Sequence, residues 1–81
     1  MHVSFYGRLA ELYGARQLTV APEGIENGTA LRDWLSSNHP HMVDLLAHPG
    51  TRLVLDNAIT DWQASLSGVT DIAIIPVVSG G

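Results

Sequence analysis

Short apolar runs, each closed by a turn residue, divide this chain into small structural elements. Residues 3–6 form an apolar-rich run that ends at Gly7, which is typical of a strand. Residues 16–20 alternate polar and apolar side chains, as a strand with one buried face does. The two runs are close in sequence, so we expect them to pair as antiparallel strands.

A short helix is predicted between these two strands. Leu9, Leu12 and Tyr13 fall on one helical face at the i, i+3, i+4 spacing. Gly14 follows directly and is a typical residue at the end of a helix. The segment is long enough for one or two turns only.

The main helix is predicted after a loop over residues 22–28. We expect Thr29 to cap its N-terminus, because a threonine hydroxyl can accept a hydrogen bond from the first turn. The helix must end before Pro40, and residues 42–46 form a second, short helical segment. The main helix carries an amphipathic stripe made of Ala30, Leu31, Trp34 and Leu35.

The C-terminal half of the chain predicts three more strands. Asp56 and Asn57 form the turn between the first two of them. The last strand is apolar on both faces, so we place it at the centre of the sheet. Pro76 cannot donate a hydrogen bond to a neighbouring strand and marks the point where pairing ends. The three strands cover residues 51–55, 58–60 and 71–75, with an irregular connection over residues 61–68.

This order of elements predicts an α+β domain with one mixed sheet and one main helix packed on one face. A chain of 81 residues forms one domain with a modest core and is too short to enclose a large substrate cavity as well. We therefore expect a domain over residues 1–76, followed by an extended, flexible tail over residues 77–81. A carrier, a binding module or a subunit is favoured over a self-sufficient enzyme.

Composition excludes several classes of function. The net charge is −4, and there is no lysine. Nucleic-acid binding is not expected, because it requires clustered cations. The absence of cysteine excludes disulfides and thiolate metal sites. There is no signal-like start and no apolar run approaching the ~20 residues that span a bilayer, so we expect a cytoplasmic protein without a membrane partner. The basic residues are spread along the chain as Arg8, Arg16, Arg32 and Arg52.

The C-terminal dipeptide is the strongest candidate for chemistry. The carboxylate of Gly81 is ionised at neutral pH and can attack an activated phosphate to form an acyl-adenylate. Gly80 and Gly81 have no side chains, so they can enter a narrow active site in backbone conformations closed to other residues. A frayed chain end is the alternative interpretation.

Other polar clusters have simpler explanations. His39, His41 and His48 lack the cysteines or spaced carboxylates that usually complete a zinc site, so no metal site is predicted. Asp56 and Asp61 could form a carboxylate pair for acid–base chemistry, but turn formation explains Asp56 more simply.

The large apolar residues leave alternatives open. Phe5, Ile74 and Ile75 could share a surface for a partner, or they could be interior. Trp34 lies on the apolar stripe of the main helix, which favours core packing. Trp62 lies in the irregular connection and could either cap the edge of the core or face a partner.

Taken together, the chain resembles the MoaD/ThiS group of ubiquitin-like β-grasp proteins, and within it the small sulfur-carrier subunit of molybdopterin synthase. Val77 stands where that subunit usually has a second proline, and residues 56–58 and 69–71 also depart from the usual pattern. The ending Pro-Val-x-Gly-Gly is closer to the molybdopterin branch than to the thiazole branch. The similarity rests on residues 3–14 (VSFYGRLAELYG), 31–35 (LRDWL) and 74–81 (IIPVVSGG).

The resemblance implies a β-grasp fold, in which the first and last strands run parallel at the centre of the sheet. It also implies that an ATP-dependent activating enzyme adenylates Gly81, and that a sulfur donor then converts it to a thiocarboxylate (1-thioglycine). The large synthase subunit would receive this sulfur for a pterin precursor, in a heterotetramer. No cofactor is expected to stay bound, since ATP is used by the activating enzyme. Partners would read the tail residues Pro76, Val77, Val78, Ser79 and Gly80.

Two other functions remain open from the sequence. The chain could carry sulfur for another pathway, such as thiazole, cysteine or siderophore synthesis. It could instead be a ubiquitin-like modifier, whose Gly81 is joined to lysines of target proteins.

Overall fold

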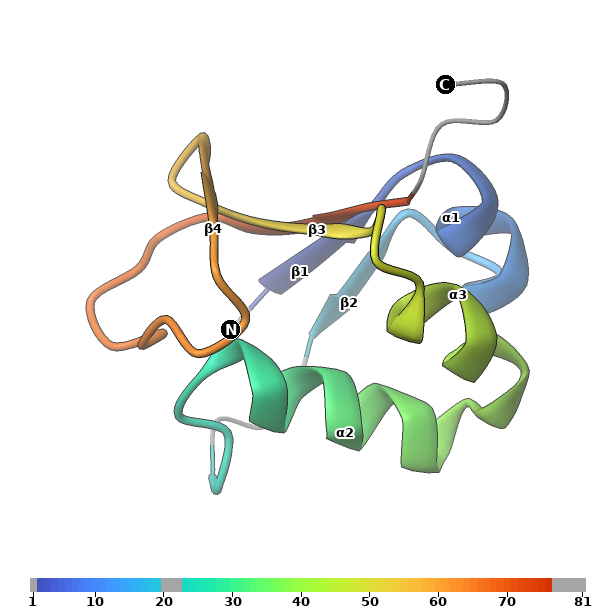
Figure 1. Cartoon of the computed structure of the whole chain (residues 1–81), viewed down its shortest axis with the longest axis horizontal. Coiled ribbons are helices and arrows are strands. Elements are labelled where there is room, and N and C mark those ends of the chain that lie inside the picture. The colour runs from blue at the N-terminus through green and yellow to red at the C-terminus, as the bar shows by residue number, and fades with distance from the viewer. Residues whose placement is uncertain (1, 20–22, 77–81) are drawn as a thin grey trace.

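Five strands form one mixed sheet, with helices packed on one of its faces (Figure 1). The computed structural model describes residues 2–19 and 23–76. The strand order is β2-β1-β5-β3-β4. The strands are β1 (His2–Phe5), β2 (Gln17–Thr19), β3 (Arg52–Leu55), β4 (Ala58–Thr60) and β5 (Ile72–Ile75).

The centre of the sheet is the parallel pair β1 and β5, and every other pairing is antiparallel. Val3 lies opposite Ile72, and Phe5 lies opposite Ile74. Strand β5 is hydrogen-bonded on both sides, to β1 and to β3. The central placement predicted for the last strand and the antiparallel pairing predicted for the first two strands are therefore confirmed. So is the β-grasp arrangement.

Alternation along the three inner strands decides which side chains enter the core. The buried positions of β1, β3 and β5 are separated by half-buried ones. Because cross-strand partners share a face of the sheet, the buried residues form one continuous apolar layer beneath the helices. This layer consists of Val3, Phe5, Leu53, Leu55, Ile72 and Ile74.

Helix α1 (Gly7–Tyr13) follows β1 directly and is two residues longer at its start than the apolar spacing predicts. Leu9 is fully buried, so the apolar face is assigned correctly. Gly14 ends the helix in the left-handed conformation (φ 93°), and its N–H donates to the carbonyl of Ala10 at 2.9 Å. That termination is the one expected for a glycine after the last turn.

Helix α2 (Gly28–Asn38) is the main helix, and Asn27 caps it. The Asn27 Oδ1 atom accepts a hydrogen bond from the Ala30 N–H at 2.8 Å. The prediction that Thr29 is the cap is wrong, because the helix already begins at Gly28. The Thr29 hydroxyl donates instead to the Trp62 carbonyl at 3.3 Å.

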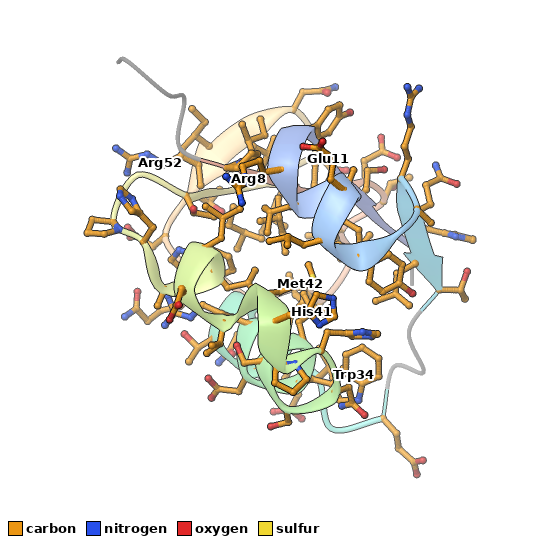
Figure 2. All side chains as sticks on the ribbon, turned by 90° about the vertical axis from the view of Figure 1, so that its right-hand side faces the viewer. Arg8, Glu11, Trp34, His41, Met42 and Arg52 are labelled. Carbon is orange, nitrogen blue, oxygen red and sulfur yellow. The ribbon has the colours of Figure 1, made fainter. Side chains whose placement is uncertain are left out.

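The second helical segment is divided into two short pieces. A 3₁₀ turn, η1 (Pro40–Met42), precedes helix α3 (Val43–Ala47). Met42 and Leu46 are buried, and Met42 lies near the centre of the molecule in Figure 2. Helices α2 and α3 thus cover the same face of the sheet (Figure 1).

The β3–β4 turn requires two residues with positive φ, Asp56 (48°) and Asn57 (70°). Asparagine and aspartate tolerate this left-handed region better than other residues with a side chain. The Asp56 carboxylate also accepts hydrogen bonds from the N–H groups of Thr70 (3.1 Å) and Asp71 (2.9 Å). These contacts tie the turn to the start of β5, so a structural role is sufficient to explain Asp56.

Candidate functional site

The base of the predicted tail is the end of the central strand. Strand β5 ends at Ile75, and Pro76 is the last residue that the structure describes in this part of the chain. The pairing of β5 with β3 extends to Arg52 opposite Ile75, so pairing ends before Pro76 as predicted. The other residues assigned to the tail lie outside the described residues: Val77, Val78, Ser79, Gly80 and Gly81.

Gly7, the first residue of α1, lies against this base just after the neighbouring strand β1 ends. Strands β1 and β5 are parallel, with Phe5 opposite Ile74, so their C-terminal ends reach the same edge of the sheet. Gly7 has φ 54°, and a Cβ atom there would lie 3.1 Å from the Pro76 Cγ atom. A residue with a side chain would therefore be strained in its backbone and crowded against Pro76.

The suggested partner surface is wrong for two of its three residues. Phe5 is 2% exposed and Ile74 is fully buried. Both lie on the helix-covered face of the sheet, because they alternate with residues that face outward. Ile75 is half-buried and lies on the opposite face, across from Arg52.

The sheet face without helices offers a different set of residues. Cross-strand register aligns Ser4, Ala73, Val54 and Ile59 in one row on that face. The Ile59 side chain is 68% exposed. Sequence reasoning missed this row, although the alternation of the strands implies that such a face exists.

The histidines are held by separate local contacts. The His39 ring packs edge-on against Tyr13, with centroids 4.8 Å apart. His41 Nε2 is hydrogen-bonded to the Leu12 carbonyl, and His48 Nδ1 accepts from the Gly50 N–H at 2.9 Å. Among residues 2–19 and 23–76, no three histidine, aspartate or glutamate side chains gather in a way that could hold a metal ion.

The two tryptophans differ in their surroundings. Trp34 packs against the core from α2, in agreement with the prediction from its position on the apolar stripe. Trp62 also packs at the edge of the core, and its carbonyl accepts from the Thr29 N–H at 2.7 Å. The Arg32 guanidinium lies over the Trp62 ring, with Cζ 4.8 Å from the centroid. Trp62 thus occupies the core edge, one of the two placements that the sequence left open.

No helix in the described part of the chain is long and apolar enough to cross a bilayer. The longest is α2, with 11 residues.

The five-stranded sheet and its packed helices define a ubiquitin-like β-grasp domain. The sequence pattern of the ThiS family matches residues 3–81, and the chain belongs to that family. A search of curated proteins finds no match.

Solved structures share the fold at low sequence identity. SAMP1 from Haloferax volcanii has a TM-score of 0.80 at 20% identity, over 99% of this chain and 97% of that one. A second structure, of H. volcanii small archaeal modifier protein 1, has a TM-score of 0.77 at 18% identity, over 95% of each chain. The protein from Pyrococcus furiosus assigned as molybdopterin converting factor subunit 1 has a TM-score of 0.73 at 17% identity, again over 95% of each chain.

Proposed function

We propose that this protein carries sulfur on the carboxyl group of Gly81 for the synthesis of molybdopterin. The observation that supports this most is the ThiS-family match, which extends through residue 81 and so includes the Gly-Gly ending. The fold adds a well-paired base for the tail, since β5 is paired with β1 up to Ile74 and with β3 up to Ile75.

The proposed chemistry uses the chain's own carboxylate and the active sites of its partners. The Gly81 carboxylate attacks the α-phosphate of ATP, a bond to pyrophosphate breaks, and an acyl-adenylate forms. A sulfide equivalent then attacks the acyl carbon and displaces AMP, which leaves a thiocarboxylate. This route needs no cysteine on the carrier, and the chain contains none.

The molybdopterin branch is favoured by the ending Pro76-Val77-x-Gly-Gly. The fold likeness to the Pyrococcus furiosus protein is compatible with that assignment. In this proposal the large subunit of molybdopterin synthase binds the carrier in a heterotetramer. The thiocarboxylate sulfur attacks a carbon of the pterin precursor and displaces the oxygen bonded to it, so a C–S bond replaces a C–O bond. Hydrolysis of the resulting thioester returns Gly81 to a carboxylate and leaves the sulfur on the pterin.

Intact-mass spectrometry tests the proposal. The chain is incubated with a molybdopterin-type activating enzyme, ATP and sulfide, and we expect the mass gain of one oxygen-to-sulfur exchange. A variant lacking Gly80 and Gly81 should show no gain, whereas a Ser37→Ala control on the exposed side of α2 should load normally. Loading of the truncated variant, or dithiolene formation by the large subunit without the thiocarboxylate, would contradict the proposal.

Pull-down with purified partners separates the pathways. Binding to the large synthase subunit supports the molybdopterin assignment. Preferential binding to thiazole synthase would instead assign the carrier to the thiazole pathway.

A second candidate function is protein modification through Gly81. It is favoured by the fold likeness to the two Haloferax volcanii structures, one of which is described as a small archaeal modifier protein. A modifier would form isopeptide bonds between Gly81 and lysines of other proteins after activation. After trypsin digestion such adducts carry residues 53–81 on the target lysine, because Arg52 is the last basic residue of the chain, and a thiocarboxylate-only product would exclude this candidate.

A further inference from the structure

A hollow of about 250 Å³ lies at the edge of the sheet, beside strand β4. Its walls come from α2, from the connection between α3 and β3, and from the segment that follows β4. Two of the four arginines of this acidic chain, Arg32 and Arg52, line the hollow together with His48. Figure 2 shows Arg52 at the periphery of the molecule, directed away from the core.

The arginine of α2 is held in place within this hollow. The Arg32 guanidinium lies over the Trp62 ring, with Cζ 4.8 Å from the centroid. The backbone of Trp62 is fixed in turn, because its carbonyl accepts from the Thr29 N–H at 2.7 Å. A guanidinium stacked on an indole keeps the N–H groups on its edge free to donate to an oxyanion.

His48 and Thr60 add polar groups to the same walls. His48 Nδ1 accepts from the Gly50 N–H at 2.9 Å, so the neutral ring carries its proton on Nε2 and remains a donor there. The Thr60 hydroxyl is buried and has no hydrogen-bond partner among residues 2–19 and 23–76. A buried polar group of this kind is costly to leave unsatisfied.

The charge of the lining matches a single carboxylate. Arg32 and Arg52 contribute two positive charges and Asp61 contributes one negative charge, so these three side chains together carry one net positive charge. One carboxylate neutralises this charge. A phosphate dianion would leave the hollow negative and would lie in the field of Asp61 as well.

A second, more apolar hollow of about 650 Å³ adjoins the first across β4. The two share Arg52, Thr60, Asp61 and Gln63, and the second adds Ile59 and Ala64. The Ile59 side chain is 68% exposed, so it offers a large apolar surface. An occupant that fills both hollows must combine a carboxylate with a neighbouring apolar group.

We propose that the β4 edge is a docking site for a partner protein segment that presents an acidic side chain next to an apolar one. The acidic side chain enters the hollow between Arg32 and Arg52, and the apolar side chain covers Ile59. This proposal does not depend on sulfur carriage by the chain.

Nuclear magnetic resonance with two matched peptides tests the proposal. The ¹⁵N-labelled chain is titrated with Ac-Val-Glu-Val-NH₂ and with Ac-Val-Gln-Val-NH₂, which differ only in the charge. We expect the Glu peptide to shift the Nε–H signals of Arg32 and Arg52 and the indole signal of Trp62. The Gln peptide should bind at least about tenfold more weakly, because charge-assisted hydrogen bonds are lost.

Substitutions locate the contact. Arg32→Gln and Arg52→Gln should each weaken binding of the Glu peptide severalfold, and Ile59→Ser should weaken both peptides. Arg16→Gln is the matched control, because Arg16 is an exposed arginine that does not line either hollow. An unchanged amide spectrum outside the site verifies that each variant is folded.

Three outcomes would overturn the proposal. The first is equal binding of the Glu and Gln peptides, or shifts centred away from β4. The second is no shift at tens of millimolar peptide. The third is inorganic phosphate binding as tightly as the Glu peptide, which would make the hollow a site for small ions instead of a docking site for protein.

Discussion

Gly7 and Pro76 contact each other where the two parallel central strands end. The contact is close because Gly7 has no side chain, and a Cβ atom there would lie 3.1 Å from the Pro76 Cγ atom. Gly7 also has φ 54°, in the left-handed region. The absence of a side chain at Gly7 thus allows Pro76, the residue after β5, to lie close to the start of α1.

We therefore expect Gly7→Ala to impair loading of the Gly81 carboxyl group as well as stability. The positive φ alone should lower the free energy of unfolding by about 1–2 kcal/mol. The added methyl group should also displace Pro76 and slow formation of the thiocarboxylate severalfold. Urea denaturation measures the first effect, and mass spectrometry of the loading reaction measures the second.

Gly14→Ala is the matched control for this experiment. Gly14 has φ 93°, and a Cβ atom there meets nothing within 4 Å. The control should lose a similar amount of stability and load at the wild-type rate. Equal loading by both variants would show that the contact with Pro76 has no influence on the tail.

Substitution of Phe5 should lower stability far more than substitution of Ile59. Phe5 is 2% exposed and packs against Tyr13, with ring centroids 4.8 Å apart, so Phe5→Ala should lower the free energy of unfolding by about 3–5 kcal/mol. Ile59 is largely exposed, and Ile59→Ser should change stability by less than about 0.5 kcal/mol. Thermal or urea unfolding of both variants gives the comparison. A small loss for Phe5→Ala would contradict its placement in the core.

The contrast between these two residues also explains what the sequence could and could not predict. The strands, their sequence along the chain and the central place of residues 72–75 follow from apolar periodicity and from turn residues, whereas the parallel pairing of the first and last strands is implied by the family resemblance. For β5, the sequence does not predict which face is buried, because apolar residues stand on both faces of the strand. Only the register with β1 and β3 assigns Ile74 to the interior and Ile75 to the outer face.

The hollow beside β4 could not be predicted from the sequence either, because the fold brings together residues that are far apart in the chain. Arg32 and Arg52 are far apart in the chain, and their separation in sequence suggested dispersed charge. The sheet topology brings α2 and the start of β3 to the same hollow, which also holds Trp62. The Gly-Gly ending, in contrast, is recognisable from sequence because it is contiguous.

The cap of α2 gives a third prediction. The Asn27 side chain accepts from the Ala30 N–H at 2.8 Å, so Asn27→Ala should lower the free energy of unfolding by about 1 kcal/mol. Asn27→Asp keeps an acceptor at the cap and should retain most of the stability. Urea denaturation of the two variants checks the assignment. A Thr29→Ala variant that loses clearly more than Asn27→Ala would contradict it.

Asp56 connects the β3–β4 turn to the central strand, and this connection gives the last prediction. Its carboxylate accepts from the Thr70 and Asp71 N–H groups, while its own N–H donates to the Asp71 carbonyl at 2.9 Å. Its φ of 48° adds a conformational requirement that alanine meets poorly.

Asp56→Ala removes the side-chain acceptor and strains the turn, so we expect a loss of about 2 kcal/mol in the free energy of unfolding. Asp56→Asn keeps an oxygen acceptor and tolerates the left-handed conformation, so it should lose about 1 kcal/mol or less. Hydrogen exchange of the Thr70 and Asp71 amides locates the effect, since both should exchange faster in Asp56→Ala than in Asp56→Asn. Unchanged exchange in the alanine variant would mean that the carboxylate does not hold the start of β5 in solution.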